Sequence, residues 1–391
     1  MRQKVLLFLL AAITAIGIVP AKAVLSVASI PPVFDELLHA SSLSNPAMIL
    51  IDGETGEVVY EKNSLSQRKP ASVMKILSGV ATLKYLDPQA VFTTEVSLGV
   101  QEKTLVIQGS FDPWISTSHS VARKMNRESL PYLAFNSMSA LKRTNGGSLE
   151  QIKVLYSGLY SQDVANLKSF WAKRGFKPTM KSVSSDEASL NAESFVVGDT
   201  SPTLDKVLDF TLKWSDNLLA ERLARLSARA AGYTFNDIGV SATFAEILGS
   251  FNIDSTQLVV ADASGLSKQN RITAAMLGQL LYKVRNDERY NLLYRSLPVG
   301  GVSGTLRSRF LSTAPSAIGL VHAKTGTLNG TVTLAGYVES SDREYIFVTL
   351  ADEIPRGAKA GSRARDAIDR ILGRIAAPNI PTEISEAQPA A

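Results

Sequence analysis

One predicted helix, residues 72–86, constrains the fold most strongly, because it is apolar around nearly its whole circumference. Its apolar positions do not fall on one face: Val73, Met74, Ile76, Leu77, Val80, Ala81 and Leu83. A helix without a broad polar stripe has to be covered on all sides by the rest of its domain. Ser72 and Lys75 are the polar exceptions in its first turn. The sequence therefore predicts a central, buried helix that begins with a Ser–Lys pair.

The segments on either side of this helix predict a mixed fold. A strand at 48–52 and its hairpin partner at 57–61 precede it. After it come two helices with periodic leucines, three strands with short turns and a final amphipathic helix: 204–212, 218–226, 319–328, 331–338, 344–350 and 364–375. Strands joined by short turns pair antiparallel. We therefore predict the α/β (α+β) class, with an antiparallel sheet and a helical cluster built from residues 24–92 and 200–378.

Residues 93–199 have a different pattern, with short strands separated by loops rich in Ser, Asn and Gly. Strands are expected at 93–98, 104–108 and 152–156. The last of these, a following helix with Val164 and Trp171 on one face, and the segment after Gly175 would form a β-α-β unit. We predict that this segment is a smaller inserted domain.

The N-terminus predicts export. A short basic region, residues 1–4, precedes an apolar run from Val5 to Val19, and Ala21-Lys22-Ala23 fits a cleavage site with small residues. Residues 1–23 are thus expected to be a signal peptide, with an uncleaved N-terminal anchor as the alternative. Either reading predicts export to the periplasm or extracytoplasmic cell-wall space. If the signal is removed, no stable membrane span is expected to remain. The tail, residues 379–391, is expected to be disordered.

Composition excludes several kinds of site. The chain has no Cys, and its three histidines are far apart: His39, His119 and His322. Thiolate sites are therefore excluded, no histidine pair has the spacing of zinc ligands, and we expect no metal and no cofactor. Basic residues outnumber acidic residues by five, but three of the basic residues lie in the leader. The rest of the chain is close to neutral, so nucleic acid is not an expected partner. Arg222, Arg225 and Arg229, at helical spacing, are predicted to form a solvated helix face.

Three short motifs indicate the chemistry. S-x-x-K begins at Ser72, S-D-N at Ser215 and K-T-G at Lys324. Each alone has an ordinary explanation, such as a helix cap or a strand-to-turn transition. Together, and in this order, they form the set found in serine enzymes that react with penicillin.

The Ser–Lys spacing has a chemical consequence. Residues three apart on a helix share a face, so the Lys75 amine can reach the Ser72 hydroxyl. A serine hydroxyl is a poor nucleophile until a neighbouring base takes its proton. Lysine serves as that base only when its pKa is lowered, which burial and a nearby positive charge from Lys324 would supply. Backbone N–H groups at the helix start also suit an oxyanion hole.

Further segments extend the resemblance beyond the motifs. The chain resembles the class C low-molecular-mass penicillin-binding proteins, the D-alanyl-D-alanine carboxypeptidase/endopeptidase family, in five segments: Ile51–Glu57 before the nucleophile, Leu105–Pro113, Ser215–Leu223, Asp262–Ser267 and Leu297–Leu306. The resemblance is good over 48–115 and 202–350 and poor over 116–200. It implies a β-lactamase/transpeptidase-like domain with a smaller inserted domain.

The resemblance also implies a mechanism and a substrate. Ser72 would attack a D-alanyl carbonyl of peptidoglycan stem peptides, and β-lactams would acylate the same hydroxyl. The other roles implied are as follows: Lys75 as base, Ser215 as proton relay, Asn217 as substrate-amide ligand and orienter of Lys75, Lys324 as positive charge, and Thr325, Gly326 and Thr327 as the substrate-binding strand. The backbone N–H groups of Ser72 and Thr327 would form the oxyanion hole. The sequence gives no indication of the oligomeric state.

Two alternatives remain open at this point. A serine β-lactamase on the same fold would need a deacylating glutamate, usually in Glu-x-x-x-Asn. Glu221, Glu246 and Glu288 lie in the relevant interval, and none has Asn four residues later. The other alternative is a non-catalytic cell-wall-binding protein, although all motif residues are intact. Residues 116–200 also lack the aromatic-rich stretch associated with side-chain recognition, so the stem-peptide preference stays undefined.

Overall fold

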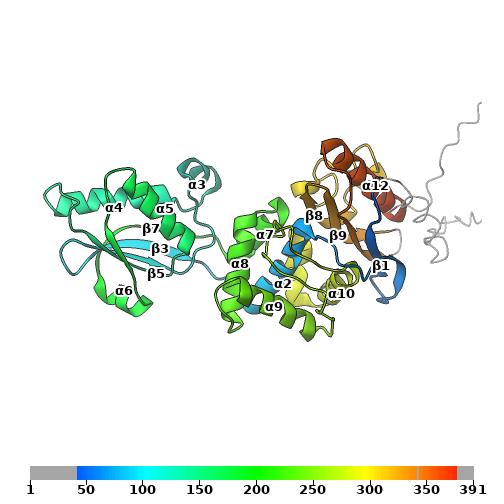
Figure 1. The fold of residues 1–391 in the computed structure, drawn as a ribbon, viewed down its shortest axis with the longest axis horizontal. Coiled ribbons are helices and arrows are strands. Elements are labelled where there is room, and N and C mark those ends of the chain that lie inside the picture. The colour runs from blue at the N-terminus through cyan, green and yellow to red at the C-terminus, as the bar shows by residue number, and fades with distance from the viewer. Residues whose placement is uncertain (1–41, 341–342, 377–391) are drawn as a thin grey trace, which may run out of the picture.

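The computed structural model describes residues 42–340 and 343–376. The predicted signal peptide and tail lie outside these residues. Figure 1 shows an elongated molecule in which two sheets lie at opposite ends, with a helical cluster between them. Within the described residues, no helix has the length and apolar character needed to cross a bilayer.

The first sheet has five antiparallel strands in the order β2-β1-β10-β9-β8. Their bounds are β1 Ala47–Asp52, β2 Val58–Lys62, β8 Val321–Leu328, β9 Thr331–Glu339 and β10 Glu344–Ala351. The N-terminal hairpin thus joins the three C-terminal strands, with Leu50 opposite Phe347. The predicted antiparallel sheet and the α/β (α+β) class are confirmed.

Helices cover both faces of this sheet and form two separate cores. One face packs against the helical cluster: α2 Lys75–Tyr85, α7 Leu204–Trp214, α8 Asn217–Ala230, α9 Asp237–Ser250, α10 Ala274–Arg285 and α11 Asn291–Ser296. The other face packs against α12 Ala358–Ala376. The short 3-10 helices are η2 Ala71–Met74, η3 Glu288–Tyr290, η4 Gly304–Leu306 and η5 Pro315–Ala317. Every residue of α2 from Lys75 to Leu83 is buried, as its apolar circumference predicts.

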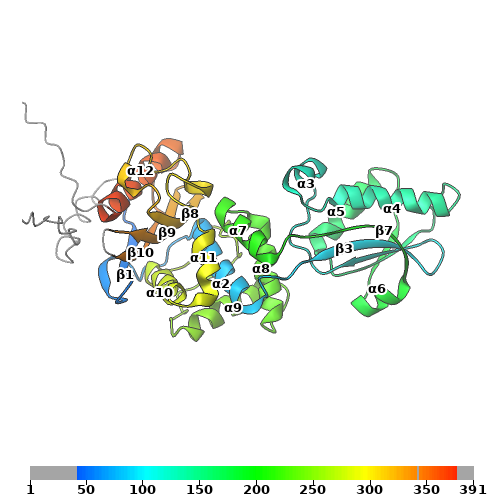
Figure 2. The same ribbon diagram turned by 180° about the vertical axis from the view of Figure 1, so that it is seen from behind.

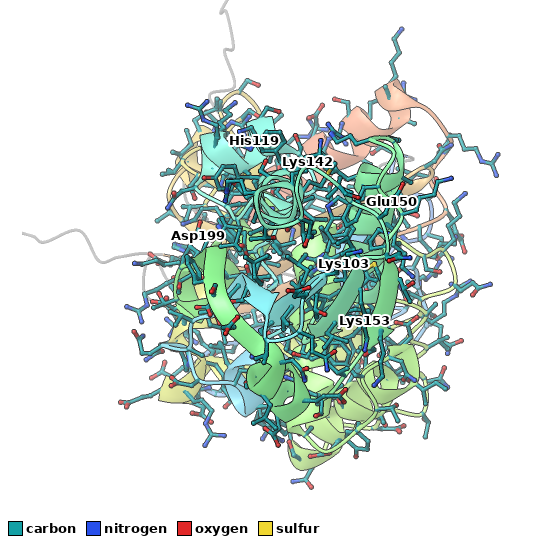
Figure 3. All side chains as sticks on the ribbon, turned by 90° about the vertical axis from the view of Figure 1, so that its left-hand side faces the viewer. Lys103, His119, Lys142, Glu150, Lys153 and Asp199 are labelled. Carbon is teal, nitrogen blue, oxygen red and sulfur yellow. The ribbon has the colours of Figure 1, made fainter. Side chains whose placement is uncertain are left out.

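The second sheet lies in residues 93–200 and has the order β6-β5-β4-β3-β7. Its strands are β3 Thr93–Gly99, β4 Thr104–Gly109, β5 Lys153–Ser157, β6 Thr179–Ser182 and β7 Ala192–Thr200. Its helices are α3 His119–Met125, α4 Leu130–Thr144, α5 Ser161–Ala172 and α6 Ser185–Asn191. The predicted β-α-β unit is confirmed, because β5 and β6 are parallel and α5 connects them. Figure 3 looks onto the end of this segment, where Lys103, Glu150 and Lys153 lie.

Helix α8 lies at the junction between the two parts of the molecule (Figure 2). Its predicted solvated arginine face is wrong at Arg222, which is only 1% exposed. Arg222 Nη2 donates to Asp163 Oδ1 of α5 at 2.6 Å, and Nη1 donates to the backbone carbonyls of residues 112, 113 and 115. Arg229 stacks on Phe111 at 4.6 Å. Arg222 therefore fastens α8 to residues 93–200, whereas Arg229 is exposed, and Arg225 is partly exposed and pairs with Asp237 of α9.

Candidate active site

The candidate nucleophile lies in a tight turn that leads into the buried helix. Ser72 belongs to the 3-10 helix η2, and Lys75 is the first residue of α2. A 3-10 turn has three residues, so side chains three apart are aligned along its axis. Lys75 Nζ accordingly lies 3.0 Å from Ser72 Oγ. The Ser–Lys contact expected from the spacing is present.

Two further contacts orient the amine of Lys75. Nζ donates to Asn217 Oδ1 at 2.7 Å and to the carbonyl oxygen of Ser264 at 2.7 Å. Both partners accept only, so they occupy two N–H groups of the amine. In the neutral amine, the remaining lone pair then faces the Ser72 hydroxyl, which can donate. This arrangement suits proton transfer from Ser72 to Lys75.

The charge state of Lys75 is compatible with that transfer. Burial lowers the pKa of its amine to about 8. Three carboxylates oppose this lowering, in decreasing order Glu221, Asp216 and Asp262. An amine with a pKa of about 8 is neutral in about a tenth of the molecules at pH 7 and in about half of them at pH 8.

Lys324 interacts electrostatically with Lys75, and burial also lowers its own pKa. It is fully buried on β8, and its Nζ donates to the Thr325 carbonyl at 3.1 Å. Burial and repulsion from the Lys75 ammonium hold the pKa of Lys324 well below its usual value. At Lys75, by contrast, burial is the main cause of the lowered pKa. The repulsion is mutual, so it disfavours the state in which both amines are charged.

The S-D-N motif forms the turn between α7 and α8. Ser215 ends α7 in the left-handed region, with φ of 61°. Asp216 caps α8, because its Oδ1 accepts the N–H of Leu219 at 3.0 Å. Asn217 is the first residue of α8, so this cap fixes the side chain that contacts Lys75. The turn is part of the site through Asn217, and Ser215 lies two residues before it.

The K-T-G motif runs along β8 beside the turn that carries Ser72. A Cβ on Gly326 would lie 2.1 Å from Thr333 Oγ1 and 2.9 Å from the Ser72 backbone nitrogen. Only glycine allows this approach between strand and turn. Thr333 Oγ1 also donates to the Pro70 carbonyl at 2.8 Å, which ties β9 to the same turn. Thr327 follows Gly326 and is exposed.

Some contacts at the site have no counterpart in the motif analysis. The loop 262–267 carries the Ser264 carbonyl, and Asp262 holds that loop by accepting backbone N–H groups of Gly265 and Ser267. Glu221 Oε1 accepts the Ser264 N–H at 2.8 Å. Thr305 of η4 lies 2.8 Å from Thr325 through their hydroxyls. In the sequence, only Asp262 of the D-A-S-G-L-S segment could have indicated that the loop 262–267 belongs to the site.

The family follows from comparison with known proteins. The model of the D-Ala-D-Ala carboxypeptidase 3 (S13) family matches residues 34–144 and 157–375. The chain belongs to this family. It is therefore a serine-type carboxypeptidase, a hydrolase, as the resemblance of its motifs implies.

Individual relatives of the chain are also carboxypeptidases or penicillin-binding proteins. Carboxypeptidase DacB of Mycolicibacterium smegmatis is 28% identical over 384 residues, covering 85% of this chain and 81% of that protein. The D-alanyl-D-alanine carboxypeptidase of Actinomadura sp. is 36% identical over 154 residues, covering 38% and 28%. Penicillin-binding protein 4 of Haemophilus influenzae superposes with a TM-score of 0.65 at 16% identity, covering 89% of this chain and 98% of that one. It has also been solved with a β-lactam. This likeness shows the β-lactamase/transpeptidase-like fold.

Proposed function

We propose that the protein is an exported D-Ala-D-Ala carboxypeptidase/endopeptidase that cleaves peptidoglycan stem peptides through an acyl-enzyme on Ser72. One observation carries the proposal. The buried amine of Lys75 lies 3.0 Å from Ser72 Oγ while two acceptors hold its other N–H groups. This is the arrangement that an unactivated hydroxyl needs to become a nucleophile.

The reaction would proceed in two stages. Lys75 takes the Ser72 proton as Oγ attacks the carbonyl of the D-alanyl bond, and Ser215 passes a proton to the leaving amine. Water then cleaves the ester and regenerates Ser72. Backbone N–H groups of Ser72 and Thr327 hold the developing oxyanion, a contribution of about 2.7–4 kcal/mol for one such donor elsewhere.

The K-T-G strand would bind the substrate. Thr325 and Thr327 receive its terminal carboxylate, Lys324 adds positive potential, and Asn217 holds the substrate amide. The close approach of Gly326 to Ser72 supports this, since it places the strand directly beside the nucleophile. Residues 24–92 and 200–378 would form the peptidase domain, and residues 93–199 the inserted domain.

Export and β-lactam sensitivity are part of the proposal. The basic and apolar leader supports removal of residues 1–23 and release into the periplasm or cell-wall space. β-Lactams would acylate Ser72, as the complex of the Haemophilus influenzae relative with a β-lactam suggests by analogy.

The β-lactamase alternative has less support from the geometry. A deacylating glutamate has to be available to a water molecule beside the acyl group. Glu221 is engaged with the Ser264 N–H, and Glu246 accepts from Tyr85 at 2.6 Å. Glu288 opens η3. The non-catalytic alternative conflicts with the assembled Ser72–Lys75–Asn217 contacts.

Product analysis tests the proposal. We expect the purified protein to release D-alanine from an acetylated stem pentapeptide ending in D-Ala-D-Ala, and to open cross-linked stem dimers. The Ser72→Ala variant should lose both activities by about 10³-fold or more, because the nucleophile is gone. A pentapeptide ending in L-Ala is the matched control. Hydrolysis of benzylpenicillin without D-alanine release would favour the β-lactamase, and neither activity would favour the non-catalytic protein.

A further inference from the structure

A helical excursion from the second part of the molecule reaches the S-D-N turn. The chain leaves the β4 side at Trp114, forms α3 and returns at Arg127 before α4 begins. Its base is closed by the Ser116 N–H donating to the Glu128 carbonyl at 2.8 Å and the Leu130 N–H donating to the Ser116 carbonyl at 2.9 Å. Figure 1 shows α3 beside the junction with α7 and α8. The excursion is thus a built element that ends beside the candidate active site.

Arg127 is held at the point where the excursion meets α7. Its guanidinium lies 4.2 Å from the ring centroid of Trp114 and 5.0 Å from that of Phe210. The indole N–H of Trp114 donates to the Asn126 carbonyl at 3.0 Å, which fixes the ring under the arginine. The side chain of Arg127 is only 7% exposed. A cation stacked and buried in this way has a defined direction.

The guanidinium of Arg127 points to Asp216 of the S-D-N motif. Arg127 Nη2 lies 3.5 Å from Asp216 Oδ2, while the other carboxylate oxygen, Oδ1, caps α8. Asp216 stands between Ser215 and Asn217, and Asn217 contacts Lys75. The guanidinium therefore forms an ion pair, without a hydrogen bond from Nη2, with the carboxylate that fixes the start of α8. Arg127 itself touches no group of the Ser72–Lys75 pair.

We propose that Arg127 is a positioning residue for the S-D-N turn, so that the segment 93–200 sets the acylation rate through the Arg127–Asp216 ion pair. The inference rests on the proposed function, because it assumes that Ser72 is acylated. Through this contact, the segment 93–200 would position a catalytic motif of the other part of the molecule.

The ion pair also has an electrostatic consequence. The Asp216 carboxylate raises the pKa of Lys75, and so do Glu221 and Asp262. Asp216 and Asp112 stabilise the Arg127 charge electrostatically, and Arg222 opposes it. Removing the Arg127 charge leaves Asp216 uncompensated, so the pKa of Lys75 rises further. Acylation then needs a higher pH, which a purely structural role for Arg127 would not require.

Acylation by benzylpenicillin between pH 6 and 10 tests the inference, with Arg123→Ala on the exposed side of α3 as the matched control. Arg127→Ala should acylate about 10-fold more slowly, the cost of a small misplacement. Its pH profile should move to higher pH, and that of Asp216→Asn to lower pH. Asparagine still caps a helix, so Asp216→Asn keeps α8. Arg127→Lys should restore the profile but only part of the rate.

Combining the variants separates the outcomes. In the Asp216→Asn background, Arg127→Ala should have little further effect, because the ion pair is already absent. The inference is overturned if Arg127→Ala behaves like Arg123→Ala, or if its rate loss is additive with Asp216→Asn and the profile does not move. If Arg127→Ala fails to fold, Arg127→Lys and Asp216→Asn carry the same test. A wild-type protein that is not acylated at all overturns the proposed function as well, which distinguishes the two failures.

Discussion

The Lys75→Met variant should be acylated by benzylpenicillin about 10²- to 10⁴-fold more slowly than the wild type, the usual cost of removing a general base. Met fills a similar volume without a basic group, so the buried start of α2 stays packed. The wild-type rate should rise as the pH is raised through about 8, because the neutral amine of Lys75 is the active form. The variant should lack this rise. Stopped-flow or quenched acylation assays across this pH range provide the measurement.

The control lies on the same helix. Lys84, near the end of α2, donates to Ser250 Oγ at 2.6 Å and lies away from the motifs. Lys84→Met should therefore keep both the rate and its pH dependence. Equal acylation rates for Lys75→Met and the wild type would show that another group takes the Ser72 proton.

The Gly326→Ala variant should also lose most of its acylation rate, by about 10²-fold, because β8 has to move away from the nucleophile turn. The new methyl group would lie 2.1 Å from Thr333 Oγ1 and 2.9 Å from the Pro70 carbonyl oxygen. The second contact is with backbone, so a rotamer change cannot relieve it. We also expect the free energy of unfolding to fall by about 1–3 kcal/mol, as for overpacked cores.

Gly249→Ala is the matched control for this variant. Gly249 lies in α9 with no heavy atom within 4 Å of the added methyl group. Alanine is the better helix former, so stability should stay equal or rise slightly. Thermal unfolding and acylation rates measured for both variants provide the comparison. Wild-type values for Gly326→Ala would show that the approach of β8 to Ser72 is not required.

Periodicity and short motifs were sufficient to predict the part of the fold around Ser72. The apolar circumference of α2 requires cover on all sides, and that cover is the sheet and helical cluster. The strands β8, β9 and β10 have strong β patterns and short turns, so their antiparallel pairing could also be predicted. The pairing of β1 with β10 joins the two ends of the chain, and no local pattern specifies it.

The segment 93–200 shows where patterns are too weak. Helix α4 was not predicted, although its buried residues recur at helical spacing, because Ser137 interrupts its apolar face and Tyr132 and Phe135 are exposed on the other side. Strand β7 was missed because only Val197 of its nine residues is buried, so its sequence does not alternate. In both elements, packing against neighbours outweighs local propensity.

Long-range contacts account for the residues of the site that were missed. Arg222 looks like part of a solvated helix face, but its partner Asp163 is 59 residues away in the sequence. Lys75 uses the backbone carbonyl of Ser264, and a carbonyl has no sequence signature. Arg127 and Asp216 are 89 residues apart in the sequence and meet only in the folded chain. Such contacts depend on the tertiary structure and have no motif.

The mass of the intact protein after incubation with benzylpenicillin tests the central claim most directly. The account predicts an adduct of one equivalent that peptide mapping places on Ser72, and that is absent from the Ser72→Ala variant. An adduct on another residue, or rapid hydrolysis of the drug with no lasting adduct on Ser72, would contradict it.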